Sequence, residues 1–244
     1  VMVMAWLARL GHQPIAIIGG GTAKVGDPSG KDKTRTMLDD AAIHANSECF
    51  RIQLTQILSA ATEGAEACPD LILIDNSEWL NQLNYIEFLR DIGQHFSVNR
   101  MLSAESAKQR LERNQGLSFI EFNYHLLQSY DFLVLNERYG CGLQVGGDDQ
   151  WFNILGGVDL IRRVAQKEAH ALTVPLLATA DGKKMGKTEK GAVWIDPAQC
   201  SPFDYFQYWL NVHDDDTIRF LKLYTFLDME QISELAQLTG SDIR

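Results

Sequence analysis

The fold prediction starts from the stretch Gln144-Val145-Gly146-Gly147-Asp148-Asp149-Gln150-Trp151-Phe152-Asn153. Here a strand-like run passes through two glycines and two carboxylates directly into a helical pattern. The strand-like runs of the chain are Ile15–Ile18, Leu71–Ile74, Gly142–Val145, Leu172–Leu177 and Ala192–Ile195. The clearest helical patterns are Tyr85–Gly93, Ala104–Arg113, Phe119–Asn136 and Trp151–Ala165. Short apolar strands that alternate with helices predict an α/β fold, a parallel sheet with helices on both faces.

Several local signals fix where helices begin. Ser118 and Glu121 form a capping-box pattern at the start of the Phe119 helix. Ser201-Pro202 is a cap followed by proline, and it opens a helix over Phe203–Leu210. Two further short helices are expected to start near Asp216 and Asp228. The C-terminal part is therefore predicted to be mostly helical.

Composition bounds the class of protein. The 244 residues are 45% hydrophobic, which fits a globular protein. Their net charge of −10 argues against nonspecific binding along nucleic acids. No apolar run approaches the roughly 20 residues of a membrane helix. The four cysteines lie far apart without a Cys-x-x-Cys pair, so we expect a reducing cytosol and no metal site.

The N-terminal run Val1–Leu10 is apolar nearly all round and predicts a core helix. It has no capping residue before it and no initiating methionine. We therefore expect the chain to begin inside a helix and to be a piece of a longer protein.

In open sheets of this type, ligands bind beyond the carboxyl ends of the strands, which selects residues 19–35, 75–79 and 146–153. The first segment starts with three glycines but matches neither the Walker pattern nor the dinucleotide pattern G-x-G-x-x-G. A plain turn explains these glycines equally well. Lys31, Lys33 and Arg35 suit phosphates, or a solvated face.

The helix over Phe119–Asn136 carries a polar stripe. Tyr124, Gln128 and Asp131 follow at i, i+4 and i+7 and so share one face. The stripe is either a solvent-exposed face of the helix or the lining of a small-molecule pocket. A hydroxyl, an amide and one carboxylate favour the pocket, because a solvent-exposed face usually carries Lys and Glu.

Two more segments suit a nucleotide. Asp148 and Asp149, beside the backbone amides at a helix start, fit a ribose hydroxyl or an ammonium group, although either could simply be the N-cap. Gly156-Gly157 within the next helix indicates close packing. The loop Asp181–Gly191 holds four lysines in an acidic protein, which suits a polyphosphate or a solvated loop.

Together these segments resemble the class I aminoacyl-tRNA synthetases, and within them the tyrosyl-tRNA synthetases. Lys184-Met185-Gly186-Lys187-Thr188 resembles the KMSKS signature, and Gly146–Trp151 resembles the family's GG-[SD]-DQW segment. Further matches are Gly26–Lys31, His95–Asn99 and Ser118–Phe132. The match runs in order over nearly the whole chain apart from a variable stretch near Ala42–Pro69.

The resemblance implies a Rossmann-like catalytic domain over residues 1–196 and the start of a helical domain over residues 197–244. It also implies that tyrosine and ATP, with Mg²⁺, give tyrosyl-adenylate and pyrophosphate, and that tyrosine then passes to tRNA(Tyr). No tightly bound cofactor is implied. The residues implied to hold pyrophosphate are Lys184, Lys187, Thr188, Lys31 and Arg35. The residues implied to bind tyrosine are Asp27, Tyr124, Gln128, Asp131 and Gln150. ATP is implied to be bound by Gly147 and Asp149, which contact its ribose, and by Lys187.

By the same resemblance, Asp131 would accept a hydrogen bond from the phenol, and Phe119 would lie near a homodimer interface. The family's His-x-Gly-His signature and anticodon-reading region have no counterpart here, so the chain alone is expected to be poorly active. Phe152 stands where many relatives have a small residue. A cytoplasmic location, or an organellar matrix in a eukaryote, is implied.

Two rival functions stay open at this point. One is a synthetase-like RNA-binding or splicing factor without aminoacylation, against which the intact lysine loop and Asp149 speak. The other is a tryptophanyl-tRNA synthetase. Asp131 together with Tyr124 and Gln128 favours a phenol over an indole as the ligand.

Overall fold

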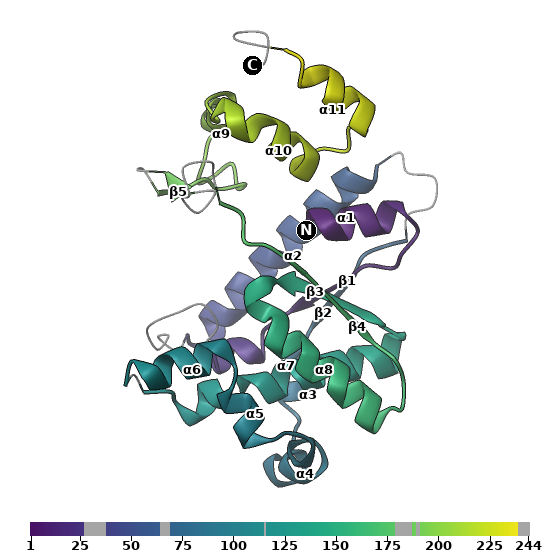
Figure 1. The fold of residues 1–244 in the computed structure, drawn as a ribbon, viewed down its shortest axis with the longest axis vertical. Coiled ribbons are helices and arrows are strands. Elements are labelled where there is room, and N and C mark those ends of the chain that lie inside the picture. Colours follow the sequence, from purple (N-terminus) through teal and green to yellow (C-terminus); the bar gives the residue numbers. More distant parts are fainter. Residues whose placement is uncertain (27–37, 64–68, 115, 179–186, 189–190, 239–244) are drawn as a thin grey trace. The chain divides into compact units, whose positions relative to one another are not determined.

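The strands form parallel pairs, as the alternating pattern predicts. The computed structural model describes residues 1–26, 38–63, 69–114, 116–178, 187–188 and 191–238, with backbone alone at 106, 187–188 and 191–192. Strand β1 (Ile15–Ile18) pairs with β2 (Ile72–Asp75), and β3 (Leu143–Gly147) pairs with β4 (His170–Val174). A short antiparallel pair joins β5 (Lys187–Thr188) to β6 (Gly191–Ala192). Within the described residues, the three pairs are separate two-stranded sheets. Figure 1 shows the labelled strands β1 to β5 among the helices.

The contacts divide the chain into two units, residues 3–175 and residues 176–244. The helices of the first unit are α1 (Met2–Arg9), α2 (Asp40–Thr62), α3 (Ser77–Leu80), α4 (Tyr85–Asp91), α5 (Val98–Leu102), α6 (Glu105–Glu112), α7 (Phe119–Tyr139) and α8 (Trp151–Val164). Three short 3₁₀ turns, η1 (Thr22–Lys24), η2 (Gly93–His95) and η3 (Asp148–Gln150), lie between them. The predicted α/β class, parallel strands flanked by helices, is confirmed.

Two expected strands differ from the structure. The strand predicted at Leu172–Leu177 begins earlier and ends earlier, because its partner β3 pairs with residues 170–174. The strand predicted at Ala192–Ile195 is wrong: only Ala192 belongs to a strand, and Trp194 and Ile195 are exposed coil. Apolar character alone does not show whether a partner strand is present.

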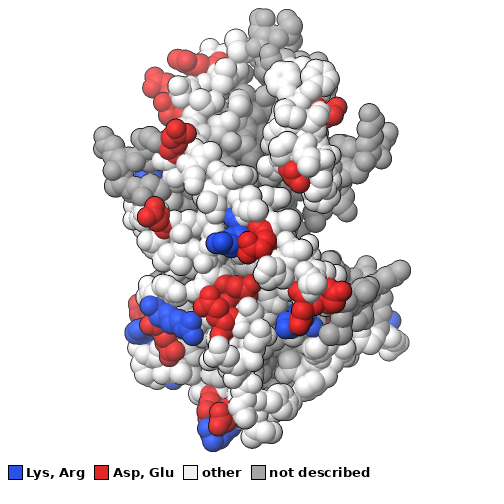
Figure 2. Space-filling model, turned by 180° about the vertical axis from the view of Figure 1, so that it is seen from behind, with Lys and Arg blue, Asp and Glu red and all other residues white. Residues whose placement is uncertain are grey.

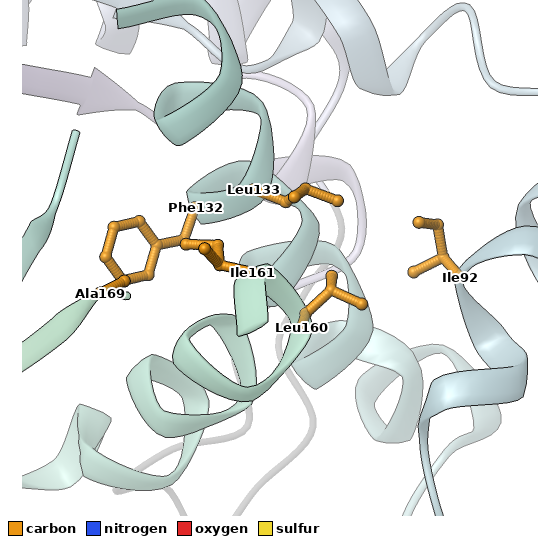
Figure 3. Packing of buried hydrophobic residues seen from close by; sticks show 6 residues of the cluster. All are labelled: Ile92, Phe132, Leu133, Leu160, Ile161 and Ala169. Carbon is orange, nitrogen blue, oxygen red and sulfur yellow. The ribbon is translucent and has the colours of Figure 1, made fainter. Parts of the chain in front are cut away.

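The core of the first unit lies where α7 packs on α8. Phe132, Leu133, Leu160 and Ile161 are nearly or fully buried there, with Ile92 and Ala169 beside them (Figure 3). A second cluster joins α7 to the first strand pair, through Val134 and Leu135 against Ile74. Helix α7 thus contacts both α8 and the strands, which holds its polar stripe in a fixed position.

The predicted capping box at the start of α7 is confirmed. The Ser118 hydroxyl accepts a hydrogen bond from the Glu121 amide, and the Glu121 carboxylate accepts one from the Ser118 amide. At the other end, Gly140 adopts the left-handed conformation that ends the helix.

Gly156 and Gly157 let α7 and α8 approach closely, as their sequence predicts. A Cβ atom on Gly156 would lie 2.4 Å from both His125 Cε1 and Ser129 Oγ, and one on Gly157 would lie 2.8 Å from Phe132 Cβ. These distances are shorter than van der Waals contact, so a larger residue would force the helices apart.

Replacing Gly156 by alanine is therefore expected to lower the free energy of unfolding by about 1–3 kcal/mol, because His125 and Ser129 must move. Urea denaturation of the chain measures this. Gly142→Ala is the matched control, since a Cβ there meets nothing within 4 Å. Equal stability of the two variants would disprove the close-packing explanation.

The second unit contains α9 (Pro202–Leu210), α10 (Asp214–Tyr224) and α11 (Met229–Leu235). The Ser201 hydroxyl caps α9 and Asp228 caps α11, as predicted, whereas α10 begins at Asp214, two residues before the expected start. Trp209 of α9 packs edge-on against Phe220 and Tyr224 of α10, with ring centroids 6.1 and 5.3 Å apart. The C-terminal part is helical, as expected.

On the face in Figure 2, lysine and arginine side chains in the middle and lower part of the view lie beside aspartate or glutamate side chains, whereas the upper part shows acidic side chains without basic ones beside them. Within the described residues, no helix is both long and apolar enough to cross a membrane.

Candidate active site

The buried side chain of Asn76 joins the end of the first strand pair to α7. Asn76 follows β2 and is 1% exposed. Its Oδ1 accepts hydrogen bonds from the amides of Gly21 (2.8 Å) and Thr22 (3.4 Å). Its Nδ2 donates to Thr22 Oγ1 (3.0 Å) and to Asp131 Oδ2 (2.9 Å). All four hydrogen-bonding positions of the side-chain amide are thus occupied, so its orientation is fixed.

Asp131 is held from two directions. Its carboxylate is buried, and Oδ1 accepts a hydrogen bond of 2.7 Å from the indole nitrogen of Trp79 while Oδ2 accepts the bond from Asn76. Trp79 is itself buried, with the guanidinium of Arg138 5.3 Å from its ring centroid. Each carboxylate oxygen retains a second lone pair, so the group is oriented but can still accept from a ligand.

Burial raises the pKa of Asp131 to about 7, and the nearby Asp75 carboxylate acts in the same direction. The hydrogen bonds from Asn76 and Trp79 lower this pKa, because they stabilise the ionised form. Above this pKa the group is ionised, and an ionised carboxylate in these surroundings is a strong acceptor for a donor that arrives with a ligand.

Tyr124 and Gln128 precede Asp131 on α7 at the predicted helical spacing, and both are partly buried. Gln128 Oε1 is buried and accepts no hydrogen bond from the described residues. A buried acceptor without a donor is costly, and a ligand ammonium group would satisfy it. The role of the polar stripe on α7 as the lining of a ligand pocket stays a prediction.

The glycines after β1 approach protein atoms closely. A Cβ atom on Gly20 would lie 2.4 Å from both carboxylate oxygens of Asp75, and one on Gly21 would lie 3.0 Å from Leu80 Cβ. These glycines therefore allow the loop to contact the end of β2, which is what brings the Gly21 and Thr22 amides to Asn76.

The second predicted segment lies at the end of β3. Asp148–Gln150 form the 3₁₀ turn η3, and α8 begins at Trp151 with Gln150 at the cap position. The alternative in which Asp148 or Asp149 is the N-cap of this helix is therefore wrong. Both carboxylates are exposed, while Gly147 ends β3. The Asp149 carboxylate accepts a hydrogen bond of 3.3 Å from Gln150 Nε2.

The remaining predicted residues belong to segments that the structure describes partly or not at all. Asp27, Lys31, Arg35 and Lys184 lie outside the described residues. Lys187 and Thr188 form β5 in the second unit, and only their backbone is described. Their roles stay predictions.

The sequence predicts no individual role for Asn76 or Trp79, although residues 75–79 form one of the three segments beyond strand ends where ligands are expected. The structure shows that these two residues hold the Asp131 carboxylate. An asparagine and a tryptophan directly after a buried strand are donors that need an acceptor, which was the available signal.

The pH dependence of stability is expected to show two opposing effects. Burial lowers the pKa of His125 from its ordinary 6.5 to about 4, whereas the pKa of Asp131 is raised from 3.8 to about 7. Between pH 4 and 6.5, Asp131 is protonated in the folded chain but ionised in the unfolded chain, so a lower pH stabilises the fold through Asp131. His125 is neutral in the folded chain but protonated in the unfolded chain, so a lower pH destabilises the fold through His125. The two effects on the free energy of unfolding nearly cancel.

Asp131→Asn removes the effect of Asp131 and leaves that of His125. The free energy of unfolding of this variant should therefore fall as pH falls from 6.5 to 4, by about 1 kcal/mol per pH unit. In His125→Asn the remaining Asp131 effect should instead make stability rise as pH falls. Urea denaturation across this window checks both slopes. Parallel pH profiles for the two variants would show that these groups are not the source.

Comparison with known proteins places the chain in a defined group. A family model described as tRNA synthetases class I (W and Y) matches residues 1–244. The chain is 57% identical over 243 residues to the tyrosine–tRNA ligase of Acetivibrio thermocellus and 52% identical to that of Clostridium botulinum strain Hall. Each match covers 100% of this chain and 58% of the relative, so the chain spans just over half the length of these proteins.

A solved structure agrees with the fold. The crystal structure of a C-terminally truncated mitochondrial tyrosyl-tRNA synthetase from Aspergillus nidulans matches with a TM-score of 0.84 and 31% identity. The match covers 97% of this chain and 69% of that chain.

Proposed function

Because the chain belongs to the class I tRNA synthetases of the tryptophan and tyrosine family, we propose that it forms the amino-acid-activating part of a tyrosine–tRNA ligase. In this reaction the carboxylate of tyrosine attacks the α-phosphate of ATP, which gives tyrosyl-adenylate and releases pyrophosphate. The tyrosyl group then passes to tRNA(Tyr). No protein nucleophile is needed, so catalysis comes from orientation and from charges that stabilise the transition state.

The observation that carries the proposal is the oriented carboxylate of Asp131, buried on α7 and held by Asn76 and Trp79. A phenol hydroxyl that donates to this carboxylate would be recognised by a short, charge-assisted hydrogen bond. The 52–57% identity to ligases named for tyrosine supports a phenol rather than an indole as the ligand.

The amino group of tyrosine would be bound one to two helical turns before Asp131. We assign it to Asp27, Tyr124 and Gln128, and the buried, unsatisfied Oε1 of Gln128 supports this assignment. Gln150 would face the carboxyl side of tyrosine. Helix α7 would thus bind both ends of the substrate, the ammonium group and the phenol.

ATP would be bound by two further groups of residues. Gly147 and the exposed carboxylate of Asp149 would hold the ribose. Lys184, Lys187 and Thr188, with Lys31 and Arg35, would hold the pyrophosphate that leaves. Mg²⁺ would enter on the ATP phosphates.

The remaining assignments concern organisation. We assign residues 1–196 to the catalytic domain and residues 197–244 to the start of a helical domain. Phe119 is 68% exposed in the first turn of α7, which supports a homodimer contact there. The wide cysteine spacing supports a reducing location, the cytoplasm or an organellar matrix.

The decisive experiment is ATP–pyrophosphate exchange by the complete enzyme, meaning this chain extended to the full length of its curated relatives. We expect exchange that depends on tyrosine. Exchange that depends on tryptophan would assign the other amino acid of the family. Absence of exchange with either amino acid, together with RNA binding, would favour the splicing-factor alternative.

A further inference from the structure

A series of hydrogen bonds runs from the partly buried His125 on α7 to the exposed carboxylate of Asp149 in η3. His125 Nδ1 lies 3.2 Å from Asn153 Oδ1. Asn153 Nδ2 donates to Gln150 Oε1 at 3.3 Å, and Gln150 Nε2 donates to Asp149 Oδ2 at 3.3 Å. Three successive contacts thus connect the helix of the tyrosine-binding stripe to Asp149.

The Asp149 carboxylate, at the exposed end of this hydrogen-bond series, determines which group donates in each hydrogen bond. An ionised Asp149 carboxylate only accepts, so the Gln150 amide nitrogen must face it and Gln150 Oε1 must face the other way. Gln150 Oε1 then needs a donor, which is Asn153 Nδ2, and this leaves Asn153 Oδ1 facing the histidine. His125 must therefore carry its proton on Nδ1.

The imidazole ring of His125 is clamped in place. The ring of Phe152 packs against it with centroids 4.3 Å apart, and Phe96 meets it edge-on at 5.3 Å. Gly156 leaves room on another side, since a Cβ there would lie 2.8 Å from His125 Nε2. Burial lowers the pKa of His125 to about 4, so the ring is neutral at pH 7. These contacts also account for Phe152, whose aromatic ring packs on His125.

We propose that His125 is a positioning residue for ATP: through Asn153 it fixes the amide of Gln150, and through Gln150 it orients Asp149 toward the ribose hydroxyls. The inference rests on the proposed function, in which Asp149 binds ribose. Asp149 is exposed, so without this support its side chain must be ordered when ATP binds, which costs affinity.

The test compares two substitutions of His125 in the complete enzyme. His125→Leu keeps an apolar body but removes the donor, and is expected to raise the KM for ATP about three- to tenfold. His125→Asn places an amide N–H where Nδ1–H stood, and should restore the wild-type KM. Urea denaturation of both variants checks that they fold. Asn153→Asp, which replaces the donor to Gln150 by an acceptor, should reproduce the effect of His125→Leu without altering the imidazole packing.

A nucleotide analogue separates positioning from a merely structural role. With 2′,3′-dideoxy-ATP, which offers Asp149 no hydroxyl, the wild type and His125→Leu should have the same KM. A loss that persists with this analogue, or a His125→Asn variant no better than His125→Leu, would overturn the proposal. Failure of the proposed function looks different, because the wild type itself would then show no tyrosine-dependent exchange.

Discussion

Replacing Asp131 by asparagine in the complete enzyme is expected to lower the selectivity for tyrosine over phenylalanine about ten- to a hundredfold. The phenol of tyrosine loses a charged acceptor, and a hydrogen bond to a charged group contributes about 1.5–3 kcal/mol. Asparagine also has one oxygen where Asn76 and Trp79 both donate, so one donor must face the new amide nitrogen. The ratio of kcat/KM for the two amino acids in ATP–pyrophosphate exchange measures the change.

Asp91→Asn is the control for this experiment. Asp91 forms an exposed ion pair with Arg90, with Oδ1 2.7 Å from Nε, and should not affect amino-acid selectivity. A selectivity ratio of Asp131→Asn within about twofold of the wild-type ratio would remove Asp131 from the phenol site, since the lost hydrogen bond corresponds to a factor of ten or more.

Replacing Glu121 by glutamine is expected to lower the free energy of unfolding of the chain by about 3–5 kcal/mol. Glu121 and Arg110 form a buried ion pair, with Nη1 3.1 Å from Oε2 and side chains 4–5% exposed. Burial pushes the pKa of Glu121 upward, but hydrogen bonds from Ser118 and Arg110 outweigh it and hold that pKa below its usual value. The substitution removes the negative charge that Glu121 places beside the buried Arg110 guanidinium. Urea denaturation measures the loss.

Two further variants identify the cause of this loss. Glu112→Gln removes an exposed carboxylate from a pair with Lys108 and should change stability by less than about 1 kcal/mol. The double variant Arg110→Met with Glu121→Leu replaces the pair by apolar side chains and should recover much of the stability. A double variant as unstable as Glu121→Gln alone would show that charge burial is not the reason.

Local signals in the sequence predicted helix starts well. The capping box of Ser118 and Glu121 and the cap at Asp228 lie at the predicted positions because these interactions involve residues three apart. Helix α2 was missed, since only Ile43, Leu58 and Ala61 are buried along its 23 residues and no apolar stripe marks it. Its capping residue Asp39, which accepts from the Ala42 amide, was a usable signal.

Long-range contacts were harder to predict. The stripe of Tyr124, Gln128 and Asp131 follows from helical spacing alone. The bonds from Asn76 and Trp79 to Asp131 join residues 55 and 52 positions apart, and no local pattern encodes such a meeting. The division into separate strand pairs is non-local in the same way, because apolar runs show which segments are strands but not which of them pair.

The resonance of the Trp79 indole N–H reports on the phenol site, because this group donates to Oδ1 of Asp131, the carboxylate that the phenol is expected to contact. Comparison with the Trp79→Phe variant assigns the signal in the ¹H–¹⁵N spectrum of the complete enzyme. Saturating L-tyrosine should shift this resonance, whereas L-phenylalanine should leave it near its free position. A bound L-tyrosine that leaves the Trp79 signal unchanged would contradict the account.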